Sequence, residues 1–230
     1  MTAIRIAPAP LVATGIDVMG SNRLILSDVT CSASTGQILA VTGSSGSGKT
    51  TLLAVFAGLL APSAGEVRFD GEPVRAGDAR HIFRTAVVLQ LYGLVSVLTA
   101  RENVEVALQA RSVGGPDVAN RAARALERVG LTDDLSDRLV EQLSGGERQR
   151  VAVARALVVE ARLVLADEPT AELDAANRDR VVAELRAEAN RGAAVVLATH
   201  DSDVAARCDD EIHLVDGMVA GTGSASTRMR

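Results

Sequence analysis

The stretch that most constrains the fold is residues 43–50, which read Gly-Ser-Ser-Gly-Ser-Gly-Lys-Thr. The glycines leave backbone N–H groups uncovered, so this loop can curl around a phosphate, and the Thr50 hydroxyl is available to a metal ion. Lys49 is the only lysine among 24 basic residues. Its ammonium is a compact point charge, whereas the guanidinium of arginine is a broad planar fork. The pattern therefore predicts a phosphate-binding loop and gives a reason for a lysine at this position.

The residues on either side of this loop predict a strand before it and a helix after it. Ile38 to Thr42 is a short apolar run that fits a buried strand, and Thr50 to Ala57 fits a helix closed by Gly58. A helix that begins at the loop directs its partial positive charge at the phosphate. The spacing is that of a Walker A motif, and its predicted phosphate ligands are Gly43, Ser44, Ser45, Gly46, Ser47, Gly48, Lys49, Thr50 and Thr51.

Composition argues against several other classes of protein. A net charge of −5 and an aromatic content of 2% do not suit a nucleic-acid surface or a base-stacking platform. Cys31 and Cys208 lie far apart without metal-type spacing, which favours free thiols in a reducing cytosol. The longest uncharged stretches, residues 50–65 and 85–100, contain polar residues or glycine. We therefore expect no membrane span and a membrane role only through another chain.

A small antiparallel sheet is predicted for the N-terminal part of the chain. Residues 1–36 alternate short apolar runs with turn formers, and residues 65–71 add a strand that ends in an Asp-Gly turn. A buried strand at 87–89 follows. Residues 212–220 predict a hairpin that closes the fold, and residues 223–230 are small and polar, as in a flexible tail.

The middle of the chain predicts a helical insert within an α/β protein. Helical patterns cover residues 101–111, 117–129 and 147–159. Uninterrupted apolar runs then follow at 163–166 and 194–198. Such runs fit a parallel sheet that is covered on both faces.

The strands predicted in the second half lead to reactive side chains. Strand 163–166 leads to Asp167 and Glu168, and strand 194–198 leads to His200. The carboxyl ends of parallel strands share one edge of the sheet with the phosphate loop, so these side chains should converge there. Asp167 is suited to hold Mg²⁺ through water, and Glu168 to orient or deprotonate a water molecule. A solvated acidic turn is the alternative interpretation of the pair.

A second anion site is predicted at residues 143–150, which read Leu-Ser-Gly-Gly-Glu-Arg-Gln-Arg. Ser144 and Glu147 have the spacing of a capping box that starts a helix. Gly145 and Gly146 leave the first N–H groups of that helix uncovered for an anion. The chain therefore carries two predicted phosphate sites.

This run resembles the signature motif of the ABC ATPase family, in which LSGGQ is commonest and LSGGE is a familiar variant. The resemblance covers nearly the whole chain, because further family motifs occur in the family's order. They are Gln90 as the Q-loop, 162–168 as the Walker B motif with its catalytic glutamate, 171–174 as the D-loop and His200 as the switch histidine.

The resemblance implies ATP and Mg²⁺ as cofactors and a dimer as the working unit. Two nucleotide-binding domains pack head to tail, and each ATP lies between the Walker A loop of one copy and Ser144, Gly145 and Gly146 of the other. The resemblance implies that Lys49 binds phosphate and takes part in catalysis, and that Thr50, Gln90 and Asp167 bind Mg²⁺. Gln90 also has an implied catalytic role. Glu168 would activate the water, His200 would contact the γ-phosphate, and Asp174 would contact the partner across the interface.

One family element departs from its usual pattern. An aromatic residue of the first sheet usually stacks on adenine, but the matching position, just before Gly20, is Met19. A thioether packs on a purine with less flat overlap than a tyrosine ring. Val18 and Ile16 are neighbouring alternatives for the same contact.

The implied fold class is an α/β P-loop NTPase with a mainly parallel RecA-like sheet, a small antiparallel subdomain and a helical subdomain that carries the signature motif. The expected organisation is a single ABC ATPase domain over 1–222, with a core of about 1–90 and 160–222, a helical subdomain of about 91–159, and a flexible tail over 223–230.

The implied function is that of the ATP-hydrolysing subunit of an ABC transporter that exports or extrudes its substrate. The implied partners are a second nucleotide-binding domain, expected to form a homodimer, and a separately encoded transmembrane permease that holds the chain at the cytoplasmic face of the membrane; no nucleic acid is expected. Residues 94–104 resemble the lipoprotein-release and macrolide-efflux subfamily. The alternative is a mechanotransmitting ATPase that regulates an extracytoplasmic or cell-division process. A DNA-repair or translation ATPase is disfavoured by the acidic charge and the missing coiled-coil insertion.

Two side-chain assignments concern the surroundings of these motifs. Tyr92, the only tyrosine, either faces the membrane partner or has a simple packing role. Arg148, Arg150 and Arg155 are expected to be ion-paired surface residues of the signature helix.

Overall fold

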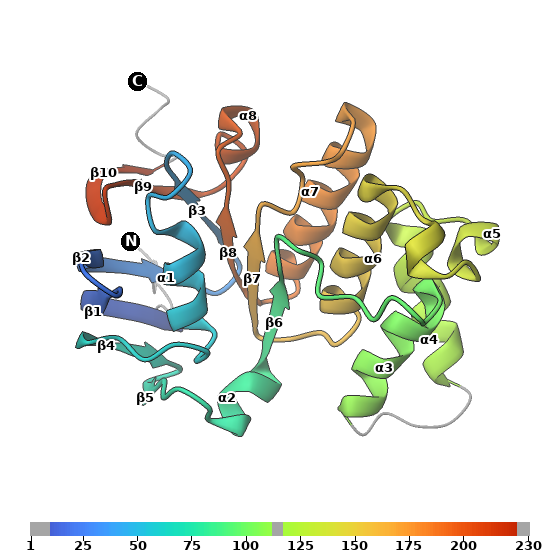
Figure 1. Cartoon of the computed structure of the whole chain (residues 1–230), viewed down its shortest axis with the longest axis horizontal. Helices are drawn as coiled ribbons and strands as arrows, with labels where there is room; N and C mark the ends of the chain where they lie inside the picture. Colours follow the sequence, from blue (N-terminus) through green and yellow to red (C-terminus); the bar gives the residue numbers. More distant parts are fainter. Residues whose placement is uncertain (1–9, 112–116, 225–230) are drawn as a thin grey trace, which may run out of the picture.

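Two β-sheets and the helices that cover them make up the computed structural model of this protein, which describes residues 10–111 and 117–224 (Figure 1). The strands are β1 (Leu11–Met19), β2 (Leu24–Ala33), β3 (Ile38–Thr42), β4 (Ala64–Phe69), β5 (Glu72–Pro73), β6 (Thr85–Val88), β7 (Leu163–Asp167), β8 (Ala194–Ala198), β9 (Asp210–Val215) and β10 (Met218–Ser224). The helices are α1 (Lys49–Phe56), α2 (Ala79–Arg84), α3 (Ala100–Ala110), α4 (Asp117–Arg128), α5 (Asp133–Ser136), α6 (Gly145–Leu157), α7 (Ala175–Asn190) and α8 (Ser202–Ala205), with a 3-10 turn at Val140–Gln142.

The larger sheet is mainly parallel and has the strand order β10-β9-β3-β8-β7-β6. Only β10 is antiparallel to its neighbour within it. The smaller sheet is antiparallel, in the order β2-β1-β4-β5, and Asp70 and Gly71 form the predicted turn between its last two strands. This arrangement confirms the predicted fold class, a mainly parallel α/β core with a small antiparallel sheet.

The larger sheet has a hydrophobic core on each face because β3, β7 and β8 are buried at every position. Ile38 and Ala40 of β3 belong to one core, together with residues of α3, α4, α6 and α7. Leu39 and Val41 belong to the other, together with α1 and the antiparallel sheet. Figure 1 shows α1 and the small sheet on one side of the molecule and the remaining large helices on the other. Strands covered on both faces need apolar residues throughout, as the sequence pattern predicted.

The helical stretch contains α3 to α6, and two of these helices begin earlier than their periodic patterns predicted, α6 at its predicted capping box. Thr99 caps α3 and Ser144 caps α6, each in a capping box, so α3 starts at Ala100 and α6 at Gly145. The side-chain oxygen of a capping residue satisfies an N–H group of the first turn, which extends the helix up to the cap. The predicted Gly-Gly-Pro connection at 114–116 lies outside the described residues. No helix within the described ranges is long and apolar enough to cross a membrane.

Two other boundaries differ from the sequence patterns. β6 ends at Val88, and Leu89, predicted as its last residue, is 42% exposed. At the C-terminal end, β10 pairs with β9 through Ser224, two residues into the segment predicted as a flexible tail. The rest of that segment lies outside the described residues. Cys31 and Cys208 are free thiols, as predicted.

Gly65 and Gly71 allow the cost of a left-handed backbone to be separated from that of a steric clash. Both have a φ of +81°, but a Cβ at Gly65 would overlap the carbonyl of Gly15, whereas a Cβ at Gly71 would meet nothing within 4 Å. We expect Gly71→Ala to lower the free energy of unfolding by about 1 kcal/mol. Gly65→Ala should lower it by about 1–3 kcal/mol more, because the β1–β4 pair must shift. Urea denaturation measures both values, and equal losses would contradict the packing argument.

Candidate nucleotide-binding site

The predicted phosphate loop connects β3 to α1. Gly48 is the N-cap of α1 and has a φ of 107°, in the region that favours glycine. The Lys49 side chain is buried, and its Nζ donates hydrogen bonds to the carbonyl oxygens of Gly43 at 2.8 Å and Ser44 at 3.2 Å. The loop therefore holds the ammonium in place through its own backbone.

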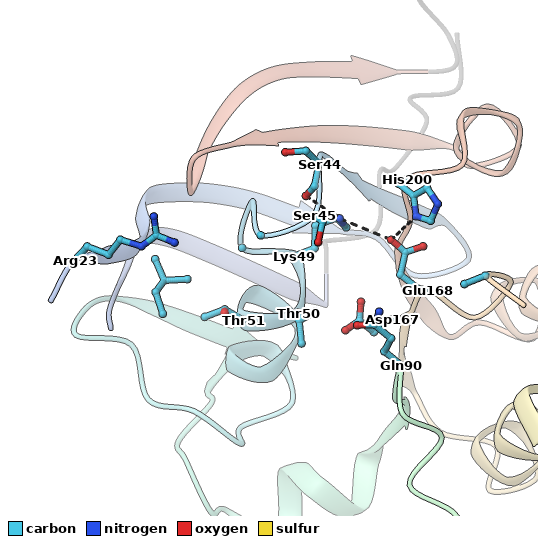
Figure 2. A pocket seen from close by; sticks show the side chains of 14 residues that line it. Arg23, Ser44, Ser45, Lys49, Thr50, Thr51, Gln90, Asp167, Glu168 and His200 are labelled. Carbon is cyan, nitrogen blue, oxygen red and sulfur yellow. Dashed lines mark hydrogen bonds and ion pairs between the residues drawn. The ribbon is translucent and has the colours of Figure 1, made fainter. Parts of the chain in front are cut away.

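The loop forms one wall of a cavity of about 650 Å³ (Figure 2). The other walls come from the ends of β6, β7 and β8 and from the start of β2, so the strand ends converge as predicted. The lining residues are Arg23, Ile25, Ser44, Ser45, Gly46, Gly48, Lys49, Thr50, Thr51, Gln90, Asp167, Glu168, Ala171 and His200. Gly43 and Ser47 belong to the loop without lining the cavity.

Glu168 connects the phosphate loop to the end of β8. Its Oε1 lies 2.9 Å from Nδ1 of His200 and 3.7 Å from Nζ of Lys49, as the dashed lines in Figure 2 show. Its N–H donates to the carbonyl of Ala198 at 2.9 Å, and its φ is 49°. A left-handed backbone is costly for glutamate and persists only where surrounding contacts determine it. The fold thus fixes a buried carboxylate beside the ammonium and the imidazole.

Asp167 supplies an oxygen that its surroundings leave unpaired. The residue is 4% exposed, and within residues 10–111 and 117–224 its Oδ1 has no hydrogen-bond partner. Burial raises the pKa of Asp167, and a hydrogen bond from the Thr50 hydroxyl opposes that rise. Carboxylate, hydroxyl and amide oxygens are ligands that suit Mg²⁺, and Gln90 lines the same cavity. The residues present therefore fit a magnesium ion that keeps part of its water shell.

The second predicted phosphate site lies outside this cavity. Ser144 is the N-cap of α6, where its Oγ accepts from the N–H of Glu147 at 3.3 Å and Glu147 Oε2 accepts from the N–H of Ser144 at 2.8 Å. The predicted capping box is therefore present. Ser144, Gly145 and Gly146 do not line the cavity. Asp174 does not line it either, because it caps α7 and accepts from the N–H of Asn177 at 2.8 Å.

The structure places Arg23 at the cavity rather than Met19. Met19 is 57% exposed at the end of β1 and does not line the cavity, whereas Arg23 and Ile25 do. Figure 2 shows the Arg23 side chain across the phosphate loop from Glu168 and His200. The sequence analysis did not predict Arg23 as a site residue. A lone cationic residue just after a turn is common on protein surfaces, so it does not indicate a binding site.

The arginines of α6 differ from their predicted role as ion-paired surface residues. Arg150 is buried, and its guanidinium donates to the carbonyl oxygens of Val129 and Gly130. Arg155 donates to the carbonyl of Tyr92 at 2.7 Å, and the guanidinium of Arg148 lies 5.7 Å from the centre of the Tyr92 ring. A guanidinium can donate to a backbone carbonyl as well as to a carboxylate. The sequence does not show which of the two acceptors lies nearby in the fold.

Comparison with known proteins identifies the family. Residues 26–171 match the family described as "ABC transporter". The chain is 42% identical over 225 residues to the phosphonates import ATP-binding protein PhnC 2 of Rhodopseudomonas palustris. This match covers 92% of this chain and 78% of that protein. It is 41% identical over 200 residues to the macrolide export ATP-binding/permease protein MacB 1/2 of Paracoccus denitrificans. That match covers 85% of this chain and 30% of the length of the MacB protein.

Solved structures agree with this family. The dimeric structure of the ATP-binding cassette MJ0796 in a post-hydrolysis state, bound to ADP and Pi, superposes with a TM-score of 0.87. That match has 31% sequence identity and covers 94% of this chain and 98% of that chain. A second dimeric structure of MJ0796, described as a bacterial ABC transporter cassette, gives the same values. The chain belongs to the ABC transporter family, and within that family it is an ATP-binding subunit with an ABC ATPase domain.

Arg23 and Met19 can be compared as contacts of the nucleotide base. We expect Arg23→Ala to weaken ATP binding about 2- to 5-fold, the size of an exposed cation–π contact, and to leave tripolyphosphate binding unchanged. Met19→Tyr should tighten ATP binding, because a flat ring overlaps a purine better than a thioether does. Titration calorimetry with both ligands measures these constants. An equal loss of affinity for ATP and for tripolyphosphate in Arg23→Ala would show that Arg23 contacts the phosphates. An unchanged dissociation constant for ATP in Met19→Tyr would show that residue 19 does not contact the base.

Proposed function

We propose that this chain hydrolyses ATP as a head-to-tail homodimer and drives a transmembrane permease encoded as a separate chain. The observation that carries this proposal is the separation of its two phosphate-binding motifs. The Walker A loop lines the cavity, whereas Ser144, Gly145 and Gly146 at the start of α6 do not. A second copy, turned head to tail, would bring its own α6 to this cavity and complete it.

In the proposed reaction the phosphates of ATP lie against the loop N–H groups and Lys49. The ammonium would exchange its bonds to Gly43 and Ser44 for phosphate oxygens. Thr50, Asp167 and Gln90 would hold Mg²⁺, which neutralises phosphate charge when it is bound.

Glu168 would accept a proton from the attacking water. Its carboxylate is buried, lines the cavity and lies 3.7 Å from the Lys49 ammonium, so it can orient the water and take up its proton. His200 would position Glu168 through the 2.9 Å contact and reach the γ-phosphate. A phosphoryl group is displaced in line, so the enzyme's main contribution is the placement of these groups.

The second copy would supply the other half of each site. The N–H groups of α6 and the Ser144 hydroxyl would bind the γ-phosphate, with the positive end of a 13-residue helix behind them. Asp174 would cross the interface to the partner. Closure on ATP and opening after hydrolysis would then move the attached permease.

We propose export as the direction of transport and the cytoplasmic face of the membrane as the location. Two observations support export: the resemblance of residues 94–104 to macrolide-efflux ATPases, and the 41% sequence identity to MacB 1/2. PhnC 2, an import protein by its name, is as similar over a larger share of the chain. Affinity capture of the tagged chain from its native membranes tests this assignment. A co-purifying permease with a large external domain would support it, and an import permease would reverse the direction.

The role of Glu168 predicts a trapped complex. We expect Glu168→Gln to retain ATP binding, to lower turnover by at least about 100-fold, the typical scale of a lost general base, and to accumulate as a nucleotide-bound dimer. Phosphate release and sedimentation velocity in Mg-ATP measure these effects. Normal turnover in this variant would remove Glu168 from the catalytic role, and a monomer at saturating ATP would contradict the composite site.

The shape of the lysine ammonium predicts a second effect. Lys49→Arg keeps the positive charge, but a planar guanidinium does not fit the space that Nζ occupies between two loop carbonyls. We expect hydrolysis to fall by at least about 10-fold, equivalent to about 1.4 kcal/mol of transition-state stabilisation. The turnover rate at saturating ATP measures it. Wild-type activity in this variant would show that charge alone is required at this position.

A further inference from the structure

The feature that the proposed reaction does not use is the position of Glu172. This residue lies between the Walker B strand and Asp174, and its side chain reaches the start of α6. A Cβ on Gly145 would overlap Oε2 of Glu172, and a Cβ on Gly146 would lie 2.9 Å from the Glu172 carbonyl oxygen. The two glycines of the signature motif are therefore packed directly beneath Glu172.

The exposed carboxylate of Glu172 lies against Gly145, at the helix end to which the proposed reaction brings a phosphate. The N-terminus of α6 carries partial positive charge and uncovered N–H groups, which favour an anion. In the head-to-tail dimer that anion is the γ-phosphate of ATP on the partner copy. A carboxylate and a phosphate repel each other at one helix end, so Glu172 must leave before the phosphate can bind.

Tyr92 holds Glu172 in this position. The Tyr92 hydroxyl donates a hydrogen bond to the Glu172 carboxylate, and burial together with this carboxylate raises the pKa of Tyr92 to about 12. Arg148 lies 5.7 Å from the centre of the Tyr92 ring, and Arg155 donates to the Tyr92 carbonyl at 2.7 Å. The φ of Tyr92 is 59°, which is costly for an aromatic residue. These contacts fix the ring against α6.

Tyr92 also lies next to the nucleotide cavity in the chain. Gln90 lines the cavity and precedes Tyr92 by two residues, and the intervening Leu91 is 87% exposed. A shift of Gln90 toward a bound nucleotide would displace the Tyr92 backbone from its left-handed conformation. The short connection therefore offers a mechanical link from the chain's own cavity to its own α6.

We propose that Tyr92 and Glu172 form a latch that covers the signature glycines until the chain's own cavity binds Mg-ATP. Binding draws on Gln90, the Tyr92 contact opens, and the Glu172 carboxylate swings away from Gly145. The uncovered helix end then accepts the γ-phosphate of the partner copy. Each subunit thus presents its signature site only after it has bound its own nucleotide. The latch rests on the proposed head-to-tail dimer.

The first test measures dimer formation in the Glu168→Gln background, where hydrolysis does not intervene. Glu172→Gln preserves the shape and removes the charge, so we expect the Mg-ATP concentration that gives half-maximal dimer formation to fall roughly 10-fold. Tyr92→Phe removes one hydrogen bond and should lower it about 3-fold. Glu72→Gln removes an exposed carboxylate on β5 and serves as the charge-matched control, with no change expected.

The outcomes of sedimentation equilibrium separate the latch from the proposed function. An unchanged or raised Mg-ATP requirement for dimer formation in Glu172→Gln overturns the latch while the dimer stands. A Glu168→Gln chain that stays monomeric in Mg-ATP overturns the dimer itself. Because binding of Mg-ATP opens the latch, the same coupling requires the monomers of Glu172→Gln and Tyr92→Phe to bind Mg-ATP more tightly, although neither side chain lines the cavity. An unchanged or weakened ATP affinity in Glu172→Gln would show that the cavity and the latch are uncoupled, and would overturn the latch.

A second test uses the spectroscopy of the chain. It contains one tyrosine and no tryptophan, so its aromatic emission reports on Tyr92 alone. We expect Mg-ATP to change the tyrosine emission of dilute, monomeric Glu168→Gln protein. The same addition should leave the emission of a Glu168→Gln, Glu172→Ala double variant nearly unchanged, because alanine cannot accept the Tyr92 hydrogen bond and the tyrosine is already released. An emission that does not respond to Mg-ATP in the chain with Glu172 would show that the cavity and Tyr92 are uncoupled.

Discussion

The burial of the central strands on both faces is the constraint on which the rest of this structure depends. β3, β7 and β8 contain almost only apolar side chains because both sides are packed, so polar groups occur only where these strands end. All three strands are parallel, and their carboxyl ends meet at one edge. The phosphate loop, Asp167, Glu168 and His200 are therefore brought together by topology before any direct interaction among them.

Much of this could be predicted from local sequence. The fold class, the two sheets and the convergence at the strand ends follow from apolar runs and turn residues, whose physical causes act within a few residues. The capping box at Ser144 and Glu147 is also local, and it is present. Helix starts were shifted by one or two residues because a periodic pattern does not include the cap itself.

What could not be predicted depends on distant contacts. Arg23 reaches the cavity because β2 runs beside α1. The sequence patterns that predict this strand and this helix do not say that the two lie side by side. Arg150 and Arg155 donate hydrogen bonds to backbone carbonyls of loops. Every residue has a backbone carbonyl, so no sequence motif indicates which ones will accept these bonds. The position of Glu172 over the signature glycines is of the same kind, because it depends on how the D-loop lies across α6. Side-chain chemistry shows what a residue can bind, and only the fold selects its partner.

The lone lysine has a consequence for the chemistry of the whole surface. Lys49 is the only side-chain amine in the chain, and it is 7% exposed inside the phosphate loop. All other cationic side chains are arginines or histidines, which acylating reagents and lysine-directed cross-linkers do not modify in the same way. Apart from the α-amino group, the protein surface therefore offers almost no amine to such reagents. Any acylation of a lysine side chain in this protein occurs at the nucleotide site, so labelling of the Lys49 side chain reports directly on whether phosphate fills the loop.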